Sequence, residues 1–230
     1  MFKHGLATAA AVFLSATAAL AAPSPATLQM LITESNLGLS SGVQSGTTPL
    51  TWTGALGAFT VNVVTGTAQG QALALNSVNI TCTTGTDSLT MKLTEQGLSG
   101  LSSTLTNFVS AVGGTLPAGS TLSFNTYIDN TNAAFGMGSL VGSQSFVGSG
   151  ALSNPNSFSG NPTGTATPGS VFSETIVVTL NVSGSAQIGF HGNVAPGSRV
   201  SVPEPGALFP LAVGLMALGY VVRRQRTLEG

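Results

Sequence analysis

Charged side chains are scarce in this sequence: Asp, Glu, Lys and Arg make up 6% of its 230 residues, against about 25% in an average protein. Within residues 22–202 the only positive charges are Lys92 and Arg199. Such a chain has no basic patch for phosphates, so nucleic acid is excluded as an expected partner. Its polarity comes from Ser, Thr, Asn and Gly, which suit the strand faces and turns of secreted β proteins. The same hydroxyl groups leave O-glycosylation open.

Cysteine and histidine are nearly missing. Cys82 is the only cysteine, which excludes an intrachain disulfide. Its place in an alternating pattern predicts a buried, small apolar side chain, with a reactive thiol or an intermolecular disulfide as open alternatives. His191 is the only histidine in 22–202, too few for a zinc site with Cys82. No Gly-x-Ser-x-Gly elbow has the flanking strand and helix of a hydrolase, so we expect an exposed or edge histidine.

Acidic and aromatic residues give no catalytic signature either. The acids of 22–202 could pair in space like those of a glycosidase, but none lies in a recognisable motif; they are Glu34, Asp87, Glu95, Asp129 and Glu174. Asp129-Asn130-Thr131-Asn132 predicts a turn, with calcium as the alternative. Trp52, with Tyr127 and Phe59, could stack on a sugar, although partly buried packing is the expected role. No enzyme, metal or cofactor is predicted.

The N-terminus has the pattern of a secretory signal peptide over residues 1–21. Lys3 and His4 form a short positive start, and an apolar stretch from Leu6 to Ala18 follows. Ala19 and Ala21 are the small residues that a signal peptidase recognises, which predicts cleavage before Ala22. The apolar run is shorter than the ~20 residues that span a membrane.

The C-terminal tail, residues 203–230, together with Val202 just before it, has three parts in a fixed order. Val202-Pro203-Glu204-Pro205 comes first, an apolar run over 206–222 follows, and Arg223, Arg224 and Arg226 close it. As a helix the run would be about 25 Å long, just enough for a bilayer core. The arginines would stop transfer and stay in the cytoplasm. The two prolines would hold Glu204 extended at the outer membrane face.

This tail resembles the PEP-CTERM sorting signal, on the Val-Pro-Glu-Pro motif, the single apolar helix and the terminal arginines. The resemblance implies processing by a multi-span transpeptidase of the exosortase type in a Gram-negative bacterium that makes exopolysaccharide. It also implies that Pro203, Glu204 and Pro205 are the recognition motif. An ordinary C-terminal anchor is the alternative. Most of residues 27–205 also resembles a recurring type of PEP-CTERM protein, on sequences such as Ser88-Leu-Thr-Met-Lys-Leu-Thr-Glu and Thr126-Tyr-Ile-Asp-Asn-Thr-Asn. These motifs are structural, so this second resemblance implies a localisation and no chemical activity.

Residues 22–202 alternate apolar and polar side chains with period 2, which predicts β-strands. The alternating apolar sets are Leu28/Met30/Ile32, Phe59/Val61/Val63, Leu89/Met91/Leu93, Leu122/Phe124/Ile128, Ile176/Val178/Leu180/Val182 and Ile188/Phe190. One pattern changes phase between Leu75 and Val78, which predicts a bulge near Asn76-Ser77. Such strands predict an all-β fold, a single antiparallel β-sandwich between a cleaved signal peptide and a C-terminal transmembrane sorting helix.

Other segments are predicted to be turns, loops or one helix. Turns are expected at 84–87, 117–119, 154–156 and 168–169, and long loops at 38–57, 133–150 and 153–169. Leu101, Leu105, Phe108 and Val112 share a helical face, so residues 101–112 could form a helix, with a strand as the alternative.

Three functions remain after these exclusions. The first is a structural or interaction protein of the cell surface or extracellular matrix, whose partners are signal peptidase, the exosortase-type enzyme, and exopolysaccharide or further copies of itself. The second is a carbohydrate-binding module of the same matrix. A secreted glycan-active enzyme comes last. We expect transient anchoring in the inner membrane, facing the periplasm, before release to the surface or medium.

Overall fold

The computed structural model describes residues 27–83, 85–101, 105–151 and 154–197. The predicted signal peptide 1–21 and the sorting tail 203–230 lie outside these residues. The described residues form fourteen strands and no helix. The strands are β1 Thr27–Glu34, β2 Gln44–Gly46, β3 Leu50–Leu56, β4 Phe59–Gln69, β5 Ala72–Cys82, β6 Thr86–Leu98, β7 Thr106–Leu116, β8 Ser120–Asp129, β9 Ser139–Val147, β10 Gly150–Ala151, β11 Asn154–Gly160, β12 Thr163–Ala166, β13 Phe172–Ser183 and β14 Ala186–Pro196.

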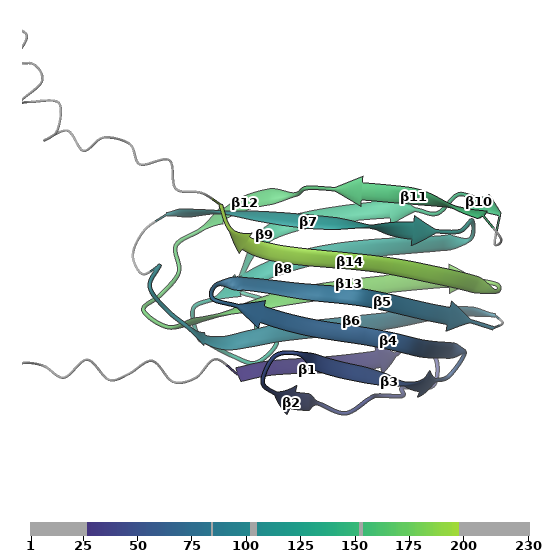
Figure 1. Ribbon diagram of the computed structural model, residues 1–230, viewed down its shortest axis with the longest axis horizontal. Coiled ribbons are helices and arrows are strands. Elements are labelled where there is room, and N and C mark those ends of the chain that lie inside the picture. The colour runs from purple at the N-terminus through teal and green to yellow at the C-terminus, as the bar shows by residue number, and fades with distance from the viewer. Residues whose placement is uncertain (1–26, 84, 102–104, 152–153, 198–230) are drawn as a thin grey trace, which may run out of the picture.

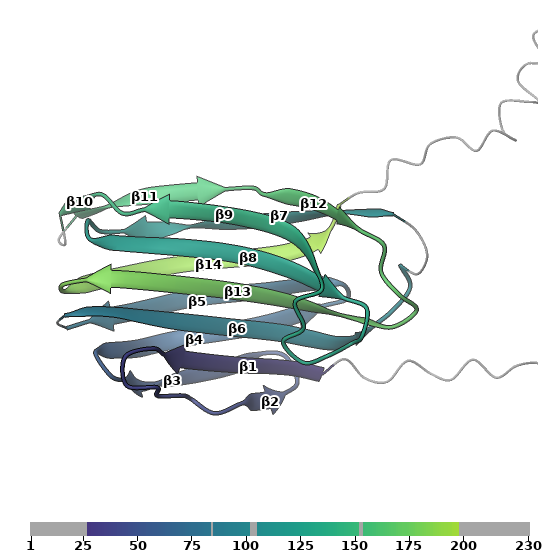
Figure 2. The same ribbon diagram turned by 180° about the vertical axis from the view of Figure 1, so that it is seen from behind.

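The strands form two antiparallel sheets that pack face to face (Figures 1 and 2). Sheet A has the strand order β2-β1-β6-β13-β8-β9. Sheet B has the order β10-β11-β7-β14-β5-β4-β3, with β12 also pairing β7. The predicted antiparallel β-sandwich is therefore confirmed for the described residues.

The two ends of the sandwich differ. The described chain begins at Thr27 and ends at Gly197 on one end, called the terminal end here (left in Figure 1). At the opposite end, the turn end, the chain passes from one sheet to the other between β5 and β6, between β7 and β8, and between β13 and β14. The predicted turn at Pro117–Gly119 is confirmed: the Ser120 amide donates to the Pro117 carbonyl, and Gly119 has a φ of 81°.

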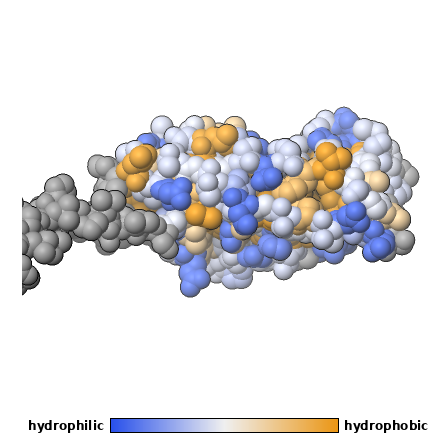
Figure 3. Space-filling view, turned by 90° about the horizontal axis from the view of Figure 1, so that it is seen from above, coloured by the Kyte–Doolittle hydropathy of each residue, from blue (hydrophilic) through white to orange (hydrophobic). Residues whose placement is uncertain are grey.

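One lateral side of the sandwich is formed by β9 of sheet A and by β11 and β12 of sheet B. Figure 3 looks onto this side. Its surface is mostly pale, with apolar patches separated by weakly and strongly hydrophilic residues. This mixture follows from the composition, since serine, threonine and glycine are neither strongly apolar nor charged.

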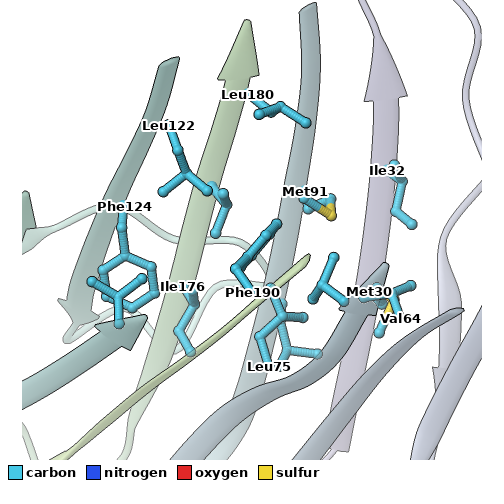
Figure 4. Packing of buried hydrophobic residues seen from close by; sticks show 14 of the residues in the cluster. Met30, Ile32, Val64, Leu75, Met91, Leu122, Phe124, Ile176, Leu180 and Phe190 are labelled. Atoms are coloured by element: carbon cyan, nitrogen blue, oxygen red, sulfur yellow. The ribbon is translucent and has the colours of Figure 1, made fainter. Parts of the chain in front are cut away.

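The core lies between the sheets and contains the predicted alternating sets of β1, β6, β8, β13 and β14. From β4 it contains Phe59, Val61 and Val64, because the pairing of this strand shifts register after Val61. Figure 4 shows Ile176 and Leu180 of sheet A on the face that packs against sheet B, where Leu75 and Phe190 lie. Phe59 and Phe124 are fully buried. Cys82 is also in this core, 1% exposed, as predicted. Fully burying a large apolar side chain such as Phe59 or Phe124 stabilises a fold by roughly 1.5–3 kcal/mol, so many such residues can hold the core together without disulfides.

The predicted phase change in β5 is confirmed. Ser77 has a φ of 51°, in the left-handed region that a non-glycine residue seldom adopts. On the neighbouring strand β4, Val63 pairs with Asn79 while Thr65 pairs with Asn76, so β5 has one residue more than its partner. This bulge moves burial from Leu73 and Leu75 to the even-numbered residues from Val78 onward.

The helix considered for residues 101–112 is wrong. From Thr106 onward the segment is strand β7, in which Phe108 and Val112 are buried, and Leu105 just before the strand is 70% exposed. Phe108 and Val112 are four residues apart, a spacing that fits both a helix face and a strand face. The polar residue between them decides: Ser110 is fully buried and its hydroxyl hydrogen-bonds that of Thr126 across the core.

The three predicted long loops each contain strands, and this expectation is corrected. β2 and β3 lie in 38–57, β9 lies in 133–150, and β11 and β12 lie in 153–169. The expected turn at 154–156 is the beginning of β11. These strands lie at or near the sheet edges, where few side chains reach the core and no strong alternation of apolar residues is needed.

Candidate functional site

The sorting residues lie outside the described part of the chain. These are Ala19 and Ala21, the motif Val202-Pro203-Glu204-Pro205, and Arg223, Arg224 and Arg226. Their roles stay predictions. Within the described residues, no helix is both long and apolar enough to cross a membrane.

His191 lies on β14, with its exposed side chain on the outer face of sheet B. The strand is central in the sheet, between β7 and β5, so the histidine is exposed but does not belong to an edge strand. Four of the five described acids lie on inward positions of sheet A, on the other side of sheet B from His191. Among the described residues, no Ser-His-Asp arrangement therefore forms around His191.

The Asp129–Asn132 segment is the turn that its sequence predicts. The Asp129 carboxylate accepts hydrogen bonds from the Thr131 hydroxyl (2.7 Å), the Thr131 amide (3.1 Å) and the Ala133 amide (3.3 Å). The hydrogen bond from the Thr131 hydroxyl lowers the pKa of Asp129. Burial raises this pKa, but the two amide hydrogen bonds lower it further, so that it lies below its usual value. Asn132 accepts from the Gly97 amide and so fastens the turn to the end of β6. Among the described residues, no group of three or more His, Cys, Asp or Glu could hold a metal ion.

The three aromatic residues considered for sugar stacking lie apart. Phe59 is fully buried in the core. Trp52 is half-buried on edge strand β3, and its ring lies over Gly54. Tyr127 is half-buried on the outer face of sheet A, paired with Thr175 and Leu140. The expected packing role fits Trp52, and no shared aromatic platform forms.

The structure brings four of the five acids together as two pairs. No local sequence motif predicts this pairing. Glu95 of β6 and Glu174 of β13 are directly opposite in register at the terminal end. Their exposed fractions are 2% and 0%. One oxygen of Glu95 and both carboxyl oxygens of Glu174 have no hydrogen-bond partner. These two acids therefore face the core, and no described residue supplies a compensating positive charge.

Burial of this first pair dominates its electrostatics. Desolvation raises the pKa of Glu95 from 4.5 to about 7. Desolvation, and then the charge of Glu95, raises the pKa of Glu174 well above its usual value. Two like charges this close in a low dielectric do not ionise together at neutral pH. The pair therefore retains protons under conditions in which exposed glutamates have lost them.

The second pair, Glu34 of β1 and Asp87 of β6, lies at the turn end. The Asn36 amide donates to Glu34 Oε1 (2.6 Å) and the Leu37 amide donates to Oε2 (2.9 Å). Gly57, with a φ of 58°, packs against the same carboxylate from sheet B. A Cβ atom at this position would lie 3.1 Å from the Glu34 carboxyl carbon, so Glu34 would have to shift slightly, and the positive φ strains any residue with a side chain there.

The two acids of the second pair have opposite pKa shifts. Burial raises the pKa of Glu34, but the hydrogen bonds from Asp87 and from three amides outweigh burial and lower it. Burial, and then the hydrogen bond to Glu34, raises the pKa of Asp87. Asp87 is therefore the proton donor to a Glu34 carboxylate.

Neither pair has the geometry of a glycosidase. In those enzymes the two carboxyl groups flank a glycosidic bond and one of them reaches water. Glu95 and Glu174 are enclosed between the sheets, and Glu34 is 1% exposed. What these pairs can do chemically is hold and release protons, with consequences for the stability of the two ends of the sandwich.

No protein-family model matches the chain, and no curated protein matches it. Among solved structures, a chain from the structure of the infectious bursal disease virus Gx strain is similar over 82% of this chain and 54% of that chain, at 11% identity and a TM-score of 0.32. This chain therefore spans about half the length of that one. A TM-score of this size does not establish a shared fold.

Proposed function

We propose that the protein is an exported structural or interaction protein of the cell surface or extracellular matrix. Signal peptidase removes residues 1–21, the apolar helix 206–222 holds the chain in the inner membrane, and an exosortase-type enzyme processes the tail. One observation carries the proposal: an export signal and the ordered sequence of Val202–Pro205, apolar run and arginine cluster bracket a single domain.

The shape of the domain supports this delivery route. Thr27 and Gly197 lie at the same end of the sandwich (Figure 1). A tail that continues from Gly197 toward a membrane leaves the turn end pointing away from it.

Glu204→Ala tests the sorting step. We expect this variant to keep its tail, because the proposed recognition motif is lost, whereas Glu229→Ala makes the same chemical change beyond the arginine cluster and is expected to be processed normally. Intact masses of the two products in fractionated native cells measure the difference. The mature mass of Glu229→Ala should equal that of the wild type, since the substituted residue departs with the tail. Equal processing of Glu204→Ala would contradict the role of the motif.

Carbohydrate binding is the second candidate, and a row of hydroxyl side chains on the outer face of sheet A favours it. Register pairing aligns Thr33, Thr90, Thr179, Ser123 and Ser145 across five neighbouring strands. Strands lie about 4.8 Å apart, so the row offers regularly spaced donors and acceptors to a repeating polymer.

Thr179→Val removes the central hydroxyl of this row with little change in shape. If the row binds the matrix polysaccharide, the dissociation constant should rise about threefold to tenfold, the worth of one hydrogen bond. Thr60→Val on the outer face of sheet B is the matched control. Titration of the purified exopolysaccharide measures both, and equal affinities for the two variants would count against this face.

A further inference from the structure

Besides the four-residue strand β12, the two sheets end in four outer edges, and three of these have features that discourage pairing with another chain. Such features include short strands, prolines and bulges. Strand β2 has three residues and β10 has two. Beside β10, β11 contains Pro155. Strand β3 has a bulge between Trp52 and Gly54.

The fourth edge, β9, lacks this protection over its second half. Its nine residues include no charge and no proline. A bulge interrupts its pairing with β8 between Leu140 and Gly142, but Ser143–Val147 pairs regularly with Asn125–Thr121. No other described strand pairs with β9. One row of main-chain N–H and C=O groups along Ser143–Val147 is therefore free of strand pairing, and Val147 at its end is 82% exposed.

The segment is also held firmly in place. The Phe146 ring packs on Phe158 of β11, with ring centroids 4.4 Å apart. The side chains of Gln144 and Phe146 pack against Gly160, which also lies on β11. These contacts come from the core side and from the other sheet, so they fix the strand while its outer edge stays unpaired. An ordered edge pairs with less loss of conformational entropy than a loose one.

We propose that Ser143–Val147 is a self-association strand, which pairs antiparallel with the same segment of a second copy. A two-fold axis at Ser145 would place Ser143 opposite Val147 and Gln144 opposite Phe146, so the segment meets itself without any like charge. The pairing would join two copies of sheet A into one continuous sheet. It deepens the proposed function, on which it rests, by naming how an interaction protein of the matrix contacts its own copies.

Disulfide trapping tests the pairing directly. Residues opposite each other in an antiparallel pair have Cα atoms about 4.5–5.5 Å apart, within the range that a disulfide bridges. The full-length Ser145→Cys chain in detergent micelles, mildly oxidised, is expected to form a covalent dimer on a non-reducing gel. Thr121→Cys, on the same face but on strand β8, and the wild type, whose Cys82 is buried, are expected to stay monomeric. Equal cross-linking of the two cysteine variants would overturn the proposal.

Light scattering gives a second, non-covalent readout. Ser145→Lys would place two ammonium groups at the two-fold axis, where like charges directly opposite each other destabilise a strand pair. We expect the dimer to weaken about tenfold or more relative to Thr121→Lys. A wild-type chain that is monomeric by light scattering would refute the pairing. That result would leave the sorting proposal intact, because tail processing is measured separately in native cells.

Discussion

Glu174→Gln is expected to raise the free energy of unfolding by about 2 kcal/mol at pH 8 and to change it little at pH 4. Glu174 lies in the core opposite Glu95, and neither acid has a positive partner in the described structure. Near pH 4 the wild-type carboxyl is protonated and as neutral as the amide that replaces it. At pH 8 the wild type must hold protons that the unfolded chain has lost, or ionise acids in the core. Glutamine removes this penalty at one of the two positions.

The direction follows from proton linkage. Both pKa values are raised in the folded protein, that of Glu95 from 4.5 to about 7. The stability due to this pair is therefore fully present below the unfolded pKa and is lost as the pH rises through the folded pKa. Between pH 4.5 and 7, each such group lowers the unfolding free energy by up to about 1.4 kcal/mol per pH unit. Relaxation and water entry at the end of the sandwich reduce that slope.

Glu34→Gln is the matched control for this prediction. The pKa of Glu34 is lowered in the folded protein, so its contribution is present above the unfolded pKa and is lost as the pH falls through the folded pKa. The same chemical substitution should therefore destabilise the protein at pH 8. Denaturant titrations from pH 4 to 8 measure both variants. A Glu174→Gln curve parallel to that of the wild type at every pH would contradict the protonated pair.

Gly114→Ala is expected to destabilise the protein by about 1–3 kcal/mol, the usual range for overpacking. Gly114 of β7 is paired directly with Phe190 of β14. A Cβ atom at Gly114 would overlap the Gly189 carbonyl oxygen and lie 2.7 Å from the Phe190 Cα atom. Both are backbone atoms of a central strand, so no side-chain rotation relieves the overlap. Thermal unfolding should begin at a clearly lower temperature than in the wild type.

The neighbouring Gly113 provides the control. A Cβ atom there would meet the Phe158 carbonyl oxygen at 3.4 Å and His191 Cε1 at 3.5 Å, which are ordinary contacts. Gly113→Ala removes conformational freedom from the unfolded chain and should leave stability unchanged or raise it by up to about 1 kcal/mol. Comparable losses in the two variants would show that strand propensity, and not the overlap at Gly114, sets the effect.

The buried strands could be predicted from the sequence because their side chains alternate. Even the bulge at Ser77 is visible as the shift of apolar residues from odd to even positions between Leu75 and Val78. The edge strands could not be predicted in this way. In β9 and β11 few side chains enter the core, so tertiary pairing and not local pattern decides the structure.

The carboxyl pairs depend on contacts between distant parts of the chain, yet the sequence pattern does indicate that Glu95 and Glu174 point inward. Glu95 continues the inward set of Leu89, Met91 and Leu93, and Glu174 shares the parity of Ile176. Extending each alternation by one step places both acids inside the sandwich. That they face each other follows only from the register of β6 and β13, which the sequence does not state.

Intact mass of the wild-type protein, recovered from fractionated native cells, tests the central proposal most directly. The account predicts a product that lacks residues 1–21 and the tail beyond Pro203-Glu204-Pro205, found outside the inner membrane. A product that still contains residues 206–230 and remains in the inner membrane would contradict sorting and indicate a permanently anchored periplasmic domain.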